Sequence, residues 1–139
     1  MTSITVRYFS KSGHTKKIAG AIAKAADCDA KAIPAPVEKP VDILFLGSSV
    51  YWAGVSSEVK DYIKSLDKTK IGKVVVFSTS GLAERAYPQI WKCLQEKGIP
   101  VDKENFYCRG AFAALHRGHP DENDLKNAAA FTKKVLGAY

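Results

Sequence analysis

The segment from Ser10 to Thr15 holds the residues that are best suited to chemistry, in the order Ser-Lys-Ser-Gly-His-Thr. The β-branched and aromatic residues before it, Ile4 to Phe9, predict a strand. The apolar residues after it keep helical spacing, at Ile18, Ala19, Ile22, Ala23 and Ala26. A strand that leads through such a turn into a helix offers free amides and the positive end of the helix dipole to an anion. The pattern therefore predicts a phosphate site.

Each residue of this turn has a possible role at a phosphate. The hydroxyls of Ser10, Ser12 and Thr15 can donate hydrogen bonds, and Gly13 allows close approach of the backbone. The alternative is an ordinary helix start without a ligand, but three hydroxyls exceed what helix capping requires. Further positive charge could come from the two remaining side chains, Lys11 and His14.

The rest of the chain alternates strand and helix patterns within a single predicted domain, 1–139. Further strands are expected at about 30–33, 42–47, 73–78 and 105–112, and further helices at about 56–66, 86–97 and from 120 or 121 to near the end. The stretch 34–40 contains three prolines and predicts an irregular connection in place of a helix. Unbroken apolar runs such as Val74 to Phe77 are typical of strands that are covered on both faces. The alternation favours a parallel sheet with right-handed crossovers.

Several classes of phosphate-binding protein are excluded by their missing motifs. The chain has neither the nucleotide P-loop G-x-x-x-x-G-K-[ST] nor the G-x-G-x-x-G turn after the first strand. A phosphatase of this topology would need a cysteine in the first turn. A receiver domain would need an aspartate at the end of the third strand, where Gly47 and Ser48 stand.

Taken together, the segments after the predicted strands resemble those of the flavodoxin family. The run Gly47 to Gly54 is similar to the family loop G-[ST]-x-x-Y-[WG]-x-G, 77–81 resembles the third loop, and 107–110 with 118–125 resembles the closing segment. The resemblance implies a three-layer, doubly wound α/β fold with a five-stranded parallel sheet in the order 2-1-3-4-5. It also implies FMN at the carboxyl edge, which is the arrangement known for flavodoxin itself. The cofactor-binding residues that it implies are Ser10, Lys11, Ser12, Gly13, His14, Thr15, Ser48, Ser49, Val50, Tyr51, Trp52, Ala53, Gly54, Thr79, Ser80, Gly81 and Leu82.

The resemblance assigns roles to the aromatic and small residues of these loops. Trp52, and less strongly Tyr51, would stack on the flavin ring instead of packing on a neighbouring helix. Gly54 with Ala53 would lie at the flavin N5, where a small residue lets a peptide reorient. Amides of Ser80 and Gly81 would face the pyrimidine edge, unless they only form a tight turn. Trp91, by contrast, is expected in the core with Tyr87, Ile90 and Leu94.

Two departures from the family bear on function. The chain has a formal net charge of +7, whereas flavodoxins that carry electrons are usually acidic. Leu82 and Ala83 stand where many carriers have an aromatic residue over the outer flavin face. The expected function is therefore a low-potential electron-transfer protein that binds FMN, more a carrier than a stand-alone enzyme. The alternative is an FMN-dependent reductase or oxidase that acts on a quinone or a similar substrate.

Composition sets the remaining expectations. Three scattered cysteines form no C-x-x-C pair, and no apolar run reaches the length of a membrane span or a signal peptide, so we expect a cytoplasmic monomer that does not enter the membrane. His116 and His119 lack a third ligand nearby in the sequence, so no metal site is expected, and no catalytic set stands out. The scattered lysines argue against nucleic acid and favour redox partner proteins with acidic surfaces.

Overall fold

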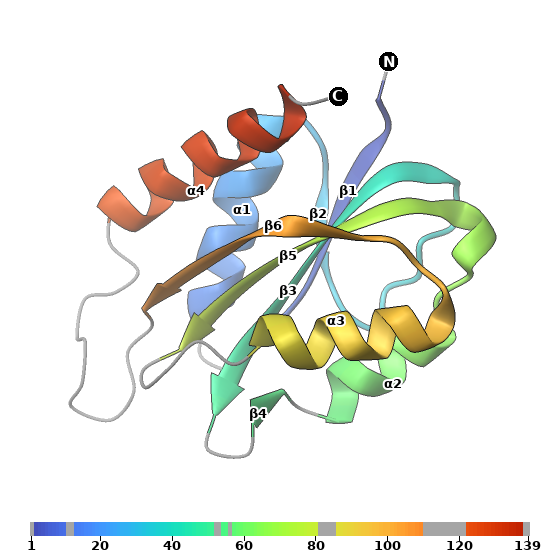
Figure 1. Ribbon diagram of the computed structural model, residues 1–139. Coiled ribbons are helices and arrows are strands. Elements are labelled where there is room, and N and C mark those ends of the chain that lie inside the picture. Colours follow the sequence, from blue (N-terminus) through green and yellow to red (C-terminus); the bar gives the residue numbers. More distant parts are fainter. Residues whose placement is uncertain are drawn as a thin grey trace.

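A computed structural model describes most of the chain. The described residues are 2–10, 13–51, 54–55, 57–80, 86–109 and 122–137. Figure 1 shows a twisted sheet with helices on both faces. The strands are β1 (Ile4–Phe9), β2 (Ala30–Ala32), β3 (Val41–Tyr51), β4 (Gly54–Val55), β5 (Ile71–Ser80) and β6 (Val101–Arg109). The helices are α1 (His14–Ala26), α2 (Ser57–Ser65), the short 3₁₀ turn η1 (Lys68–Lys70), α3 (Ala86–Lys97) and α4 (Glu122–Leu136).

The order of the sheet confirms the predicted topology. The path is β2-β1-β3-β5-β6 with all neighbours parallel, which is the order 2-1-3-4-5 for the five main strands. The small strand β4 lies off this path and pairs with β3 in the antiparallel direction. The order reverses between β1 and β3, so the carboxyl ends of these two strands flank the crevice in which such sheets bind ligands.

The sheet separates two hydrophobic cores. Ile18 and Ile22 of α1 and Ala128 of α4 cover Phe45 and Phe77 on one face. On the opposite face, side chains of α2 and α3 cover the alternate residues of β3 and β5, among them Leu44, Leu46, Val74 and Val76. Both faces of the central strands are therefore buried, as their unbroken apolar sequences predict.

Gly47 is required by the packing of the first of these cores. A Cβ atom at Gly47 would collide with the ring of Phe77, which is itself fully buried. The partner of Gly47 in the β3–β5 register is Phe77 itself. The glycine that belongs to the flavodoxin-like loop pattern thus gives room to a core side chain.

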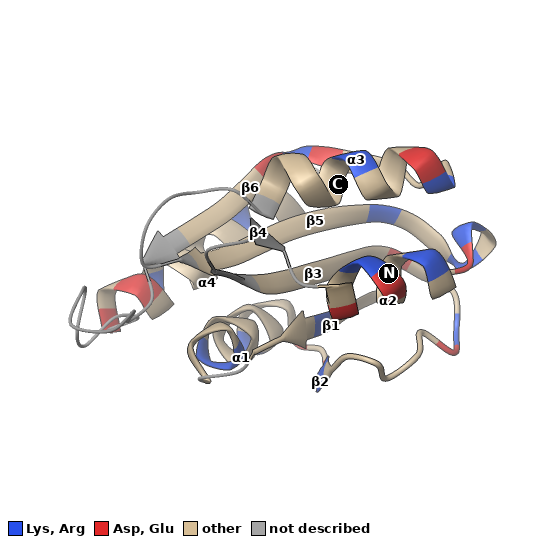
Figure 2. Ribbon diagram, turned by 90° about the horizontal axis from the view of Figure 1, so that it is seen from below, with Lys and Arg blue, Asp and Glu red and all other residues tan. Residues whose placement is uncertain are grey.

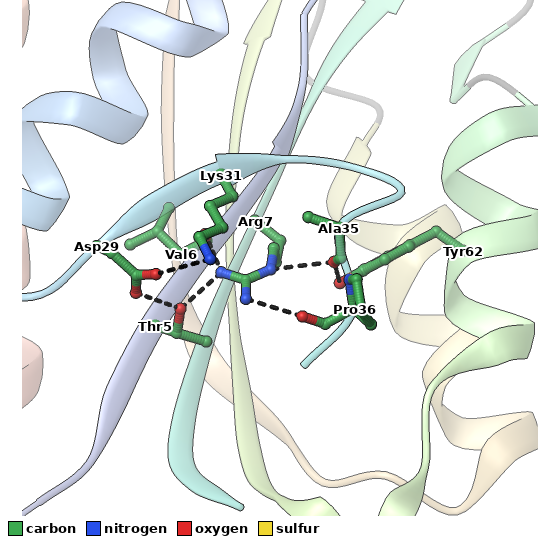
Figure 3. Close-up of polar contacts among 8 residues, drawn as sticks. All are labelled: Thr5, Val6, Arg7, Asp29, Lys31, Ala35, Pro36 and Tyr62. Atoms are coloured by element: carbon green, nitrogen blue, oxygen red, sulfur yellow. Dashed lines mark hydrogen bonds and ion pairs between the residues drawn. The ribbon is translucent and has the colours of Figure 1, made fainter. Parts of the chain in front are cut away.

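The connection from β2 to β3 contains no helix. Residues 33–40 cross the sheet as an irregular segment, as its prolines predict, and the Ile33–Pro34 peptide is cis. Arg7 of β1 fills the space beneath it and is only 4% exposed. Its guanidinium donates to the carbonyls of Ala35 (3.1 Å) and Pro36 (3.0 Å), as Figure 3 shows.

The other contacts of Arg7 tie this segment to β1 and α2. Arg7 also donates to the hydroxyl of Thr5 (2.6 Å) and to the Val6 carbonyl (3.0 Å), and Thr5 donates to Asp29 (2.8 Å). The hydroxyl of Tyr62 in α2 donates to the same Ala35 carbonyl at 2.7 Å. Burial raises the pKa of Tyr62, and the neighbouring guanidinium offsets part of that rise. A buried arginine therefore holds this crossover where a second helix would otherwise cover the sheet.

Three expectations at the ends and faces of elements need correction. β3 and β5 continue to Tyr51 and Ser80, so the strand ends include residues that were expected in loops. β6 begins at Val101 because polar residues are tolerated in a strand at the edge of a sheet. Trp91, which was expected in the core, is 44% exposed because Ile90 and Leu94 already fill the inward stripe of α3.

Candidate cofactor site

The turn between β1 and α1 has the geometry of an anion site as far as it is described. Gly13 has φ +89° and serves as the N-cap of α1, a left-handed conformation that favours glycine. Its amide donates to the Ser10 hydroxyl oxygen at 3.0 Å. The space beside Gly13 is open, because a Cβ there would meet no atom within 4 Å. The glycine is thus required by the backbone conformation as well as by any close approach of a ligand.

The first turn of α1 has neither a capping side chain at Gly13 nor an acidic residue. Helices usually satisfy their first amides with a serine, threonine or aspartate cap or with an acidic side chain. Their absence here fits a phosphate at this helix start.

Thr15 connects the helix start to the end of β5. Its hydroxyl lies 2.8 Å from the hydroxyl of Thr79, and both side chains are buried. The first helical turn is therefore linked to the strand that precedes the third loop. Sequence reasoning assigned both residues to the cofactor site but did not foresee this direct contact.

The carboxyl ends of four strands form one row of aligned residues. Phe9 pairs with Ser48, Ser48 with Ser78, and Ser78 with Tyr107. Ser48 is fully buried within β3, so it is a strand residue and not part of a loop. The carboxyl ends of β1, β3, β5 and β6 thus lie together at one edge of the sheet, as Figure 1 shows.

Ser78 is a polar residue that sequence reasoning did not single out. Its side chain is 1% exposed, and its hydroxyl has no hydrogen-bond partner in the described structure. Buried hydroxyls without a partner are rare in proteins. The Ser78 hydroxyl can donate and accept a hydrogen bond, which fits a polar ligand at this edge. The signal in the sequence was the position of this serine directly after the apolar run Val74 to Phe77.

The second predicted loop is a β-hairpin. Val50 pairs with Val55 and Tyr51 with Gly54, so the backbones of β3 and β4 face each other directly before the tip. The Gly54 backbone is therefore held by strand pairing. The predicted stacking residue Trp52 and its neighbour Ala53 are outside the described residues.

His14 is the first residue of α1, and its side chain loses a proton more readily than that of a free histidine. Partial burial, followed by the charge of Lys17 one turn along the helix, lowers its pKa below 6.5. A phosphate dianion beside it would act in the opposite direction.

The remaining predicted site residues are described in part or not at all. Only the backbone of Ser49, Val50, Tyr51, Gly54 and Ser80 is described. The predictions for Lys11, Ser12, Gly81 and Leu82, and those for His116 and His119, fall outside the described residues. Within the described ranges, no three histidine, cysteine or acidic side chains gather as a metal site, and no helix is long and apolar enough to cross a membrane.

The fold is that of a doubly wound α/β protein, and at its switch point a glycine-capped helix follows β1. The flavodoxin domain model matches residues 5–114. The chain therefore belongs to the flavodoxin family.

Relatives and solved structures agree with this membership. An uncharacterized protein of Methanocaldococcus jannaschii is 29% identical over an alignment of 138 residues. The alignment covers 88% of this chain and 90% of that protein. A flavodoxin from the domain Archaea superposes with a TM-score of 0.76 at 17% identity, covering 97% of this chain and 96% of that one. Oxidised Flavodoxin 2 from Bacillus cereus gives 0.73 at 21% identity, with 99% of both chains covered. At these identities the two structures support the fold.

Proposed function

We propose that this protein binds FMN and acts as a low-potential electron-transfer flavodoxin. The observation that carries the proposal is the start of α1, where an N-cap glycine in the left-handed conformation and a first turn without acidic residues stand at the switch point of the sheet. The membership in the flavodoxin family supports the choice of FMN as the guest. When bound, FMN would supply the redox chemistry, the transfer of one or two electrons.

The chain's own residues would bind and orient the cofactor. The turn at 10–15 would hold the phosphate through backbone amides and hydroxyls, with Lys11 and His14 adding charge. The hairpin between β3 and β4 would cover one side of the ring with Tyr51 and Trp52. Amides of Ser80 and Gly81 would face the pyrimidine edge of the ring. The hydroxyl of Ser78, buried without a partner below this edge, is available to a polar group.

The test is a visible spectrum of protein purified with no added flavin. We expect flavin absorption bands, release of FMN on denaturation, and reversible reduction without a bound substrate. A colourless protein that takes up no FMN in a titration would overturn the proposal.

We also propose a cytoplasmic location, since Cys28 and Cys93 are both free thiols, as is usual in a reducing compartment.

The second candidate is an FMN-dependent reductase or oxidase that acts on a quinone. Leu82 and Ala83 favour it because small or aliphatic residues in the third loop leave room over the ring. Steady oxidation of NAD(P)H with a quinone by the purified protein alone would establish this candidate. A requirement for a separate reductase would establish the carrier.

A further inference from the structure

A groove lies between α1 and α4 on the face of the sheet away from α2 and α3. It has a volume of about 570 Å³. Its floor consists of small or aliphatic residues of the two helices, which lie side by side in Figure 1. These residues are Gly20, Ala21, Ala25, Leu125 and Ala129.

Four lysines form the rim of this groove. Lys17 and Lys24 lie on α1, and Lys126 and Lys133 lie on α4. All four are exposed, and the described residues that line the groove include no acidic residue. Among the described residues, none of the four makes an ion pair. In Figure 2 the ribbon of α1 carries the colour of Lys and Arg and none of the colour of Asp and Glu. The groove therefore combines an apolar floor with positive charge that nothing described in the chain neutralises.

Gly20 keeps the floor of the groove low. It lies in the middle of α1, is exposed, and has no atom within 4 Å of the position that a Cβ would take. Alanine would fit there and would favour the helix by about 1 kcal/mol over glycine. The glycine thus costs helix stability without any packing reason inside the chain, and what it preserves is open space.

We propose that this groove docks an acidic amphipathic helix of a partner protein. Such a helix lays its apolar face on a groove floor, and its flanking carboxylates would meet the lysines on both sides. A second copy of this chain is disfavoured because each copy carries a net charge of +7. A nucleic acid would be expected to find arginine or aromatic side chains, and the groove is lined by neither.

The docking surface goes beyond the cofactor site and stands independently of FMN. None of its lining residues belongs to the predicted cofactor-binding set. Its first lysine, Lys17, follows His14 by one helical turn, so one end of the groove lies beside the start of α1. A partner bound along it would reach toward the carboxyl edge of the sheet.

The test uses a fluorescein-labelled synthetic helix of about 16 residues, long enough to span the groove, with leucine and alanine on one face and glutamate on the flanks. Its affinity is measured by anisotropy, and its site by amide NMR shifts, with and without added FMN. We expect binding that weakens with salt. The shifts should be confined to α1 and α4. A scrambled peptide of the same composition should bind weakly.

Two groove variants and one matched control decide the outcome. Gly20→Leu fills the groove without changing charge, and Lys24→Glu with Lys126→Glu reverses two rim charges. Each should weaken binding about tenfold or more, or about 1.4 kcal/mol. Lys60→Glu with Lys64→Glu makes the same charge change on α2, where both lysines are exposed, and should leave binding nearly unchanged.

Any of four results would contradict the proposed docking surface. These are an equal loss of peptide affinity in the α2 control, full peptide binding by Gly20→Leu, amide NMR shifts outside α1 and α4, or no binding of the peptide. An oligonucleotide or an anionic vesicle that binds the groove in place of the peptide would assign it to another partner. Because the readout is peptide binding, failure of FMN to bind would leave these results unaffected.

Discussion

The hydroxyl of Thr15 lies 2.8 Å from the hydroxyl of Thr79, and the two residues are 64 positions apart in the chain. This contact joins the first turn of α1 to the last residues of β5, which precede the third predicted binding segment. Both segments are predicted to hold parts of one ligand. This buried hydrogen bond therefore links the two sides of the candidate site.

The first prediction concerns this bond. Thr15→Val and Thr79→Val should each lower the free energy of unfolding by about 1–3 kcal/mol, because each removes one partner of a buried hydrogen bond. The double variant should cost less than the sum, with a coupling energy of about 1 kcal/mol by urea unfolding. Additive losses would show that the two hydroxyls do not interact.

Arg7 should be essential for the helix-free crossover. Arg7→Met removes the guanidinium donor from the carbonyls of Ala35 and Pro36, of which the Ala35 carbonyl keeps only the Tyr62 hydroxyl. We therefore expect a loss of about 2–4 kcal/mol and faster hydrogen exchange in residues 33–40. Arg7→Lys should not restore stability, because one ammonium cannot reach the same acceptors. Lys31→Met, at an exposed neighbour whose ion pair to Asp29 is 3.9 Å long, is the control and should change stability little.

Gly47 and Gly20 should respond in opposite directions to alanine. Gly47→Ala forces its Cβ into the Phe77 ring and should cost about 1–3 kcal/mol. Gly20→Ala meets only open space and should stabilise the protein by up to about 1 kcal/mol. Thermal unfolding measures both changes. Tolerance of alanine at Gly47 would contradict the packing described here.

His14 should make the stability of the protein without ligand depend on pH. Its folded pKa lies below the unfolded value of 6.5, so the unfolded state binds more protons between the two values. The stability contributed by neutral His14 is present above pH 6.5 and is lost as the pH falls through that window. His14→Gln should remove this part of the pH profile.

NMR titration of the His14 ring provides the direct measurement. We expect Lys17→Ala to raise the pKa, and added inorganic phosphate to raise it further if the anion binds at the helix start. A pKa at or above 6.5 in the ligand-free protein would contradict the environment described for this ring.

The sheet order was predicted from the resemblance to the flavodoxin family. The helical pattern of α1, the bounds of α3 and the irregular segment 34–40 were predicted from the residues themselves, because prolines and helical spacing are local signals. The sequence did not predict that Ser48 and Thr79 are buried strand residues. Short polar residues resemble loops, and only pairing with neighbouring strands and β4 extends β3 and β5 past them. Trp91 was misplaced for a related reason, because its neighbour Ile90 occupies the inward position.

Arg7 shows a second limit of local reasoning. A basic residue within the apolar strand Ile4 to Phe9 was the available signal, but its partners are backbone carbonyls almost thirty residues away. Because every residue has a backbone carbonyl, the residue types do not reveal which carbonyls accept these hydrogen bonds. The candidate site was therefore predictable where it depends on a turn and a helix start, and less so where it depends on contacts across the sheet.

The central claim is that the turn at 10–15 holds the phosphate of FMN. The most direct measurement compares the affinities of the flavin-free protein for FMN and for riboflavin, which lacks the phosphate, by quenching of flavin fluorescence. A dianion held by helix amides and hydroxyls predicts that FMN binds at least about 100-fold more tightly, or roughly 2.7 kcal/mol. Equal affinity for the two flavins, or binding of neither, would contradict the account.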